Sequence, residues 1–161
     1  VMNLGQFLSE GDPLPPVLLP VEFHINVRGG NGVSRRRVRA VLAPVSEAER
    51  LAARREALEF LRGLPEYKGE DGKPETAKPI PGWVLEQEDA YRFLSKALRD
   101  EDNPVSAFVH ADQYARFRDG VVLEQVKWLN RIYDEFIAVE YPETGMTLGQ
   151  MQGLEAQAKK S

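Results

Sequence analysis

The sequence contains no cysteine, which excludes disulfides, thiolate metal ligands and cysteine nucleophiles. Its two histidines, His24 and His110, do not stand at a metal-ligand spacing such as HExxH or HxH. No serine lies in a GxSxG setting, and no GxxxxGK[ST] loop for phosphate binding is present. Because neither a nucleophile–base pair nor a metal signature can be assembled, we expect a non-enzymatic protein with no metal and no cofactor.

Long apolar runs are also missing. No stretch approaches about 18 consecutive apolar residues, so the sequence predicts no membrane span. The first residues lack the basic segment and apolar run of a signal peptide, which favours a soluble intracellular protein. The formal net charge of −4 provides no general attraction to nucleic acid or to anionic lipid.

What is present suffices for one folded domain, because 42% of the 161 residues are hydrophobic. Residues 1–20 are expected to form an arm that packs on its own domain or on a neighbour, since a short amphipathic piece is followed by prolines. Residues 21–27 alternate apolar and polar side chains with the period of a half-buried strand. The glycines of residues 29–32 tolerate positive φ and predict a hairpin turn before a second strand over 33–42.

The second strand places three arginines on one face and apolar side chains on the other. Such a row can bind phosphate or an acidic partner, although it more often forms a solvated face or a protected sheet edge. The residues of this possible anionic-partner face are Arg35, Arg37 and Arg39.

Four helices are expected after the hairpin. Ser46 and Glu49 form a capping box that opens a helix running to Arg62, where Gly63 can end it. Arg54 falls within the apolar face of that helix and needs either a partner or an outward path for its charge. That predicted apolar face consists of Leu51, Ala57, Leu58, Phe60 and Leu61.

Residues 63–82 contain many glycines, prolines and charges and predict a mobile loop. A second helix is expected over 84–99, and a third from Asn103-Pro104 to Arg118. The fourth, over 119–141, has apolar side chains around roughly half of its circumference. A face that wide can touch two neighbours, so this helix is expected to be both core and contact surface.

Together these patterns predict an α+β, mostly helical chain with an N-terminal β-hairpin and about four helices. The predicted division is an arm over 1–20, a single domain over 21–145 and a tail over 146–161. The tail is expected to fray when alone, because its apolar residues are interrupted by glycines and polar side chains, and a partner would induce helix in it.

The order of these elements resembles the tail assembly chaperones of long-tailed, siphovirus-type bacteriophages. The shared features are a β segment followed directly by a capped helix, here 33–42 and then Ser46 to Glu49, and a long final helix, here 121–136, ending before Tyr141-Pro142-Glu143. The resemblance covers most of residues 21–145. It implies a non-enzymatic protein of the host cell cytoplasm, absent from the mature virion, that binds the tape measure protein, keeps it soluble and promotes tail tube assembly.

In many such phages a ribosomal frameshift adds a C-terminal extension that contacts the major tail tube protein. Ala158-Lys159-Lys160 is compatible with a codon run on which ribosomes slip backward. The resemblance therefore implies the tape measure protein as a partner, the tail tube protein as a second partner through an extended form, and a possible homo-oligomer.

A chaperone for an apolar helix needs a broad hydrophobic surface rimmed by charge. On that basis the contact with a client or with a second copy is expected at Val121, Trp128, Ile132, Tyr133 and Phe136, extended by Met151 and Leu154. Two alternatives remain open: a nucleic-acid-binding or regulatory module that uses the arginine face, and a structural component of the virion.

Overall fold

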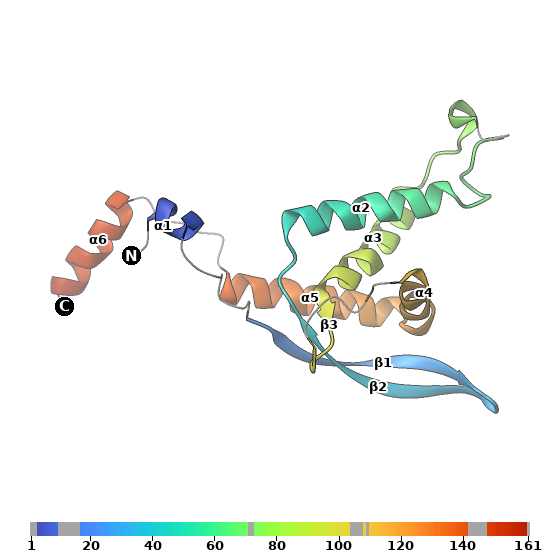
Figure 1. The fold of residues 1–161 in the computed structure, drawn as a ribbon, viewed down its shortest axis with the longest axis horizontal. Helices are drawn as coiled ribbons and strands as arrows, with labels where there is room; N and C mark the ends of the chain where they lie inside the picture. Colours follow the sequence, from blue (N-terminus) through green and yellow to red (C-terminus); the bar gives the residue numbers. More distant parts are fainter. Residues whose placement is uncertain are drawn as a thin grey trace.

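The computed structural model describes residues 3–9, 17–70, 73–103, 108, 110–141 and 148–160. The chain is α+β and mostly helical, as the sequence predicts, with a three-stranded antiparallel sheet beneath a group of helices (Figure 1). The elements are α1 (Leu4–Ser9), β1 (Leu19–Gly29), β2 (Gly32–Leu42), α2 (Glu47–Arg62), the 3-10 helix η2 (Pro74–Thr76), α3 (Gly82–Ala97), β3 (Leu98–Arg99), α4 (Ala111–Gly120), α5 (Leu123–Glu140) and α6 (Leu148–Lys160).

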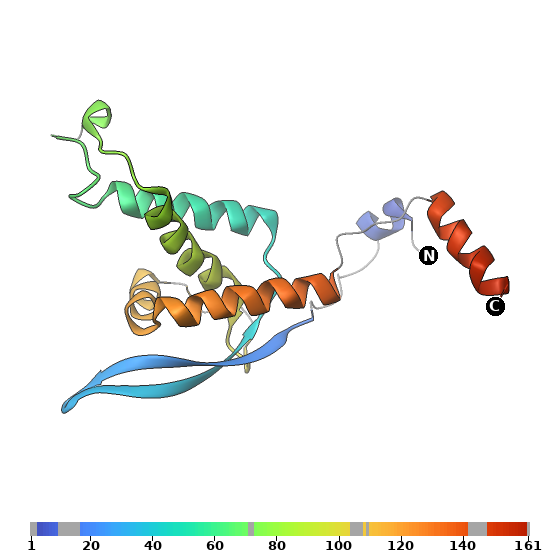
Figure 2. The same cartoon turned by 180° about the vertical axis from the view of Figure 1, so that it is seen from behind.

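The sheet is dominated by the hairpin of β1 and β2, whose register pairs Phe23 with Val38 and His24 with Arg37. The turn is confirmed: Gly32 has a φ of 115°, a conformation that residues with a side chain rarely adopt. β3 pairs only with the last two residues of β2. The outer half of the hairpin therefore projects beyond the helices, as both ribbon views show (Figures 1 and 2).

The core lies between the inner face of the hairpin and the helices α3, α4 and α5. Period-two alternation turns one face of each strand inward, and the 3.6-residue period does the same for one side of each helix. Aromatic rings interlock there, with Phe93 edge-on to Tyr133 at 4.8 Å and Tyr91 edge-on to Phe117 at 5.8 Å between ring centroids. The fully buried side chains include Leu42, Leu94, Val126 and Leu129.

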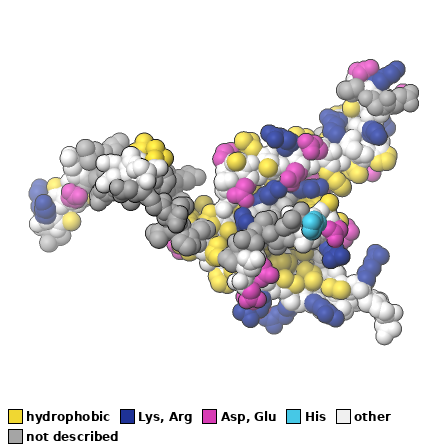
Figure 3. Space-filling view, viewed as in Figure 1, with side chains coloured by type: hydrophobic (Ala, Val, Ile, Leu, Met, Phe, Trp, Pro, Cys, Tyr) yellow, Lys and Arg dark blue, Asp and Glu magenta, His cyan; other side chains and the backbone are white. Residues whose placement is uncertain are grey.

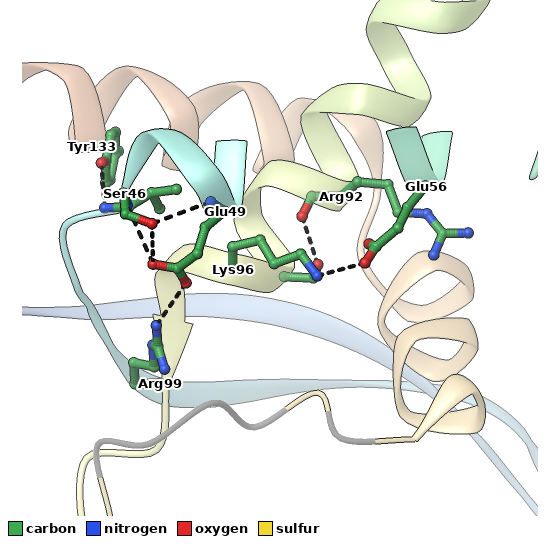
Figure 4. Close-up of polar contacts among 9 residues, drawn as sticks. Ser46, Glu49, Glu56, Arg92, Lys96, Arg99 and Tyr133 are labelled. Atoms are coloured by element: carbon green, nitrogen blue, oxygen red, sulfur yellow. Dashed lines mark hydrogen bonds and ion pairs between the residues drawn. The ribbon is translucent and has the colours of Figure 1, made fainter. Parts of the chain in front are cut away.

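The capping box at the start of α2 is confirmed. Ser46 Oγ accepts from Glu49 N at 3.1 Å, and Ser46 N donates to Glu49 Oε1 at 3.2 Å. The same carboxylate accepts from Arg99 Nη2 at 3.2 Å, and Lys96 Nζ donates to Glu56 at 2.7 Å (Figure 4). These contacts tie the first turn of α2 to β3 and the middle of α2 to α3.

The predicted apolar face of α2 is wrong in part. Leu51 is 56% exposed and Phe60 is 43% exposed, whereas the residues that bury against the body are Ala53, Ala57 and Leu61. Small alanines allow α2 to approach α3 closely, so the larger side chains on either side stay outside the contact. Arg54 forms an exposed ion pair with Asp89 of α3 at 3.4 Å, so its charge has a partner.

Two helix boundaries also differ from expectation. The third helix begins at Ala111 instead of Asn103-Pro104, and the Gln113 side chain accepts from His110 N at 2.8 Å at its start. Asp119 and Gly120 end α4 instead of opening α5, because Val121 N still bonds to Phe117 O at 3.0 Å. Pro104 itself, like the arm prolines Pro13, Pro15 and Pro16 and the helix-ending Pro142, lies outside the described residues.

The predicted loop over 63–82 contains η2, beside which Thr76 Oγ1 accepts from Glu70 N at 2.5 Å. The tail forms the helix α6, and every side chain in it whose burial is described is exposed. Among the described residues, no helix is long and apolar enough to cross a membrane.

Candidate interaction surface

The structure separates the residues predicted to contact a partner. Val121 is 2% exposed, Tyr133 is 2% exposed and Phe136 is 7% exposed, so all three belong to the core. Trp128 and Ile132 are half-buried and pack against that core. Leu154 of α6 is 52% exposed, and the side chain of Met151 lies outside what the structure describes.

This burial has a direct cause. The wide apolar face of α5 packs on α3 and on β1, and the Tyr133 hydroxyl accepts from Val45 N at 2.9 Å (Figure 4). The helix does touch two neighbours, but both belong to its own chain. Val121, Tyr133 and Phe136 are therefore not exposed on the folded monomer, and their contact with a client or a second copy stays a prediction that this burial does not favour.

Accessible apolar surface lies instead along the hairpin. Two adjoining hollows, of about 510 Å³ and about 830 Å³, share Phe23, Val38 and Phe117 as lining residues. We name the pair the hairpin groove. Its floor is the inner face of β1 and β2, and one wall is α4. The larger hollow is also lined by Ile25, Val27 and Val121.

Charged side chains border the hairpin groove at both ends. Arg28, Arg116 and Asp119 line the larger hollow. Arg37, Arg39 and the acidic run 100–102 line the smaller one, where Arg39 Nη2 lies 3.4 Å from Glu101. The space-filling view shows hydrophobic side chains above the hairpin strands with charged side chains around them (Figure 3).

One donor at the smaller hollow has no acceptor. Arg99 Nε is buried, and no described residue accepts from it, although Arg99 Nη2 reaches Glu49. A buried donor left unpaired costs about 1–3 kcal/mol.

The arginine face of β2 is exposed, as the alternation predicts. Arg37 is ion-paired with Glu22 on the neighbouring strand, and Arg39 with Glu101. The hydrogen bond from Arg37, followed by its charge, lowers the pKa of Glu22 below the ordinary value of 4.5. Arg35 stands opposite Asn26 and has no ion pair with any described residue.

The most constrained polar group, Glu88 of α3, was missed by the sequence analysis. Its carboxylate is 2% exposed and accepts from Tyr114 Oη at 2.7 Å, from Arg92 Nε at 3.1 Å and from Arg118 Nε at 3.0 Å. Burial, reinforced by the hydrogen bond to Glu88, raises the pKa of Tyr114 far above its ordinary value. The four-residue spacing from Glu88 to Arg92 and from Tyr114 to Arg118 was the available signal.

We name these four residues the Glu88 cluster. The carboxylate is occupied by three donors, and Arg92 also covers the Tyr114 ring at 3.7 Å from its centroid. The cluster does not line the hairpin groove. It joins α4 to α3, and so it fixes the position of Phe117 in the groove wall.

Within the described part of the chain, no group of three or more His, Asp or Glu side chains is arranged to hold a metal ion. Comparison with protein-family models, with curated proteins and with solved structures found no match to this chain.

Proposed function

We propose that this chain is a tail assembly chaperone of a long-tailed bacteriophage. It acts without catalysis in the host cytoplasm, binds the tape measure protein, keeps that protein soluble and promotes tail tube assembly, and it does not remain in the mature virion. The order of the hairpin, the capped helix and the long final helix supports this proposal, as stated from the sequence. An extended form reaches the major tail tube protein, and self-association is compatible with the same surfaces.

The hairpin groove is the observation that carries the proposal. A long apolar helix in water needs its apolar stripe covered, and a groove with an apolar floor and charged ends does this by the helix-in-groove mode. The two hollows lie within the range of roughly 300–1,000 Å³ that is typical of ligand pockets, so each has room for apolar side chains of a client helix.

We therefore assign the proposed client contact to the hairpin instead of α5. Ile25, Val27 and Val38 are half-buried and lie on the open floor, so a client can cover them without unfolding the core. Trp128, Ile132 and Leu154 remain proposed as secondary contacts because none of them is fully buried, and Met151, whose side chain lies outside the described part of the structure, stays proposed from the sequence alone.

Co-expression with the tape measure protein tests the proposal. Ile25→Glu places a charge on the groove floor, and the matched control Val139→Glu places the same charge on a side chain of α5 that is 76% exposed and outside the groove. We expect wild type and Val139→Glu to copurify with soluble client, and Ile25→Glu to leave most of the client in the pellet.

The folded state of each variant is checked by circular dichroism before the client is scored. If wild type neither solubilises the tape measure protein nor copurifies with it, the proposed function is wrong. If Ile25→Glu is folded and chaperones as well as wild type, the groove is not the client site. Recovery of the protein from purified virions contradicts its proposed absence there.

A further inference from the structure

The outer edge of β2 presents backbone groups that no described strand uses. His24 N donates to Gln125 Oε1, so the backbone of His24, and by alternation that of its partner Arg37, points away from the hairpin ladder. Pro20 lies four residues before His24, so its backbone also points outward, where its lack of an N–H breaks no hydrogen bond of the hairpin. On β2 the backbone of Val41 likewise points outward, and there it pairs with Arg99 of β3.

We name the outward backbone groups of Val33, Arg35, Arg37 and Arg39 the β2 edge. Because β3 is two residues long, it covers only the end of β2, and the β2 edge has no strand beside it among the described residues. The turn half of the edge lies where the hairpin projects past the helices (Figures 1 and 2). Four outward N–H and C=O pairs in a row form a template for another strand.

The side chains along the β2 edge define what that strand would carry. Arg35 and Arg37 stand on the outer face about 7 Å apart, which is the spacing of alternate residues in any strand. Arg36 and Val38 alternate with them on the inner face. The hairpin, residues 19–42, carries five arginines and one glutamate within a chain of net charge −4, so positive charge is concentrated here.

We propose that the β2 edge binds an extended acidic segment of a partner protein as an added strand. Carboxylates of the segment stand opposite Arg35 and Arg37 on the outer face, and an apolar residue stands beside Val38 on the inner face. Backbone hydrogen bonds to the edge supply affinity, and the cross-strand charge pairs supply selectivity.

A peptide strand fits this surface better than nucleic acid does. The edge offers backbone donors and acceptors in strand register, which a phosphate chain does not match. Glu22 and Glu101 already pair with Arg37 and Arg39, which lowers the field that a polyanion would follow but leaves Arg35 and Arg36 without an ion-pair partner among the described residues. The β2 edge and the smaller hollow of the hairpin groove have Arg37 and Arg39 in common, but strand addition rests on the outward backbone groups of β2 and not on the proposed client.

The test uses the full chain and a fluorescein-labelled nine-residue peptide of alternating Glu and Val, followed by fluorescence anisotropy at about 0.15 M salt. Arg35→Glu reverses a charge on the β2 edge. Arg131→Glu is its matched control, because Arg131 is likewise exposed and without an ion-pair partner among the described residues, but it lies on α5 and does not line the hairpin groove.

We expect Arg35→Glu to weaken peptide binding about fivefold or more and Arg131→Glu to weaken it less than about twofold. The same peptide with its alternate amides N-methylated should not bind, because it cannot complete the ladder. Equal losses in the two variants, or retained binding of the methylated peptide, would overturn strand addition. Tighter binding of poly(dA) than of the peptide would identify nucleic acid as the partner and also overturn it.

Discussion

α5 and the hairpin are both amphipathic by sequence, yet they use their apolar faces differently. The apolar side of α5 is covered by α3 and β1, and its Leu129 is fully buried. The inner face of the hairpin is covered only near Val21 and Phe23, and Ile25 and Val27 remain half-exposed. Periodicity therefore shows which side of an element is apolar, but it does not show how much of that side the same chain covers.

The largest effect is expected from a substitution on the covered face of α5. Leu129→Ala leaves a cavity in the core and should lower the free energy of unfolding by about 4 kcal/mol. Val27→Ala, the matched truncation on the hairpin, should cost less than about 1 kcal/mol, because Val27 has little buried area to lose. Urea unfolding measures both. Similar losses at the two sites would contradict the distinction between a covered and an open face.

A second pair of substitutions compares carboxylates. Glu88→Gln removes the buried charge between Arg92 and Arg118 and should destabilise the protein by about 2 to 3 kcal/mol, since both guanidinium groups lose their common ion-pair partner. Glu22→Gln removes the exposed partner of Arg37 and should change stability far less. Thermal unfolding by calorimetry separates the two. If Glu88→Gln were neutral, the Glu88 cluster would not hold α4 in place.

A third pair tests the hairpin turn without touching the body. Gly32→Ala places a side chain at a φ of 115° and should cost about 1 kcal/mol. Gly30→Ala is the control, because a Cβ at Gly30 meets nothing within 4 Å and its φ is not positive. Amide exchange by NMR should show faster opening of the outer hairpin in Gly32→Ala alone, with α5 unchanged. An equal effect of both alanines would contradict the assigned turn geometry.

The smallest expected effect is a change in the pKa of Glu22. Arg37 lowers the pKa of Glu22 below 4.5, so the pair contributes stability above the unfolded pKa, and this contribution is lost as pH falls through the lower folded value. Arg37→Gln should return the Glu22 midpoint toward 4.5. Carbon-13 NMR of the side-chain carboxyl measures it. An unchanged midpoint would show that Arg37 does not control this carboxylate.

Features encoded by neighbouring residues were predictable. The Ser46–Glu49 box, the alternation over 21–27 and the glycine turn are local patterns, and the structure confirms all three. Even the arginine face of β2 follows from a period of two.

Features that depend on distant partners were not predictable in the same way. Leu51 looks like a core residue by spacing, but the alanines of α2 make the close contact and leave it exposed. By its local sequence Glu88 is indistinguishable from a surface charge, because its partners Tyr114 and Arg118 lie on another helix. The hairpin groove has no sequence signal, because its floor and its wall come from segments about 90 residues apart.

The hydrogen bond from Val17 N to Tyr141 Oη, 3.1 Å long, joins a residue two positions before β1 to the residue after α5. Val17 and Tyr141 therefore lie together at one corner of the body. α5 has 18 residues, a length of about 27 Å at 1.5 Å per residue. A single helix thus sets the distance between the corner at Tyr141 and the start of α5 at Leu123.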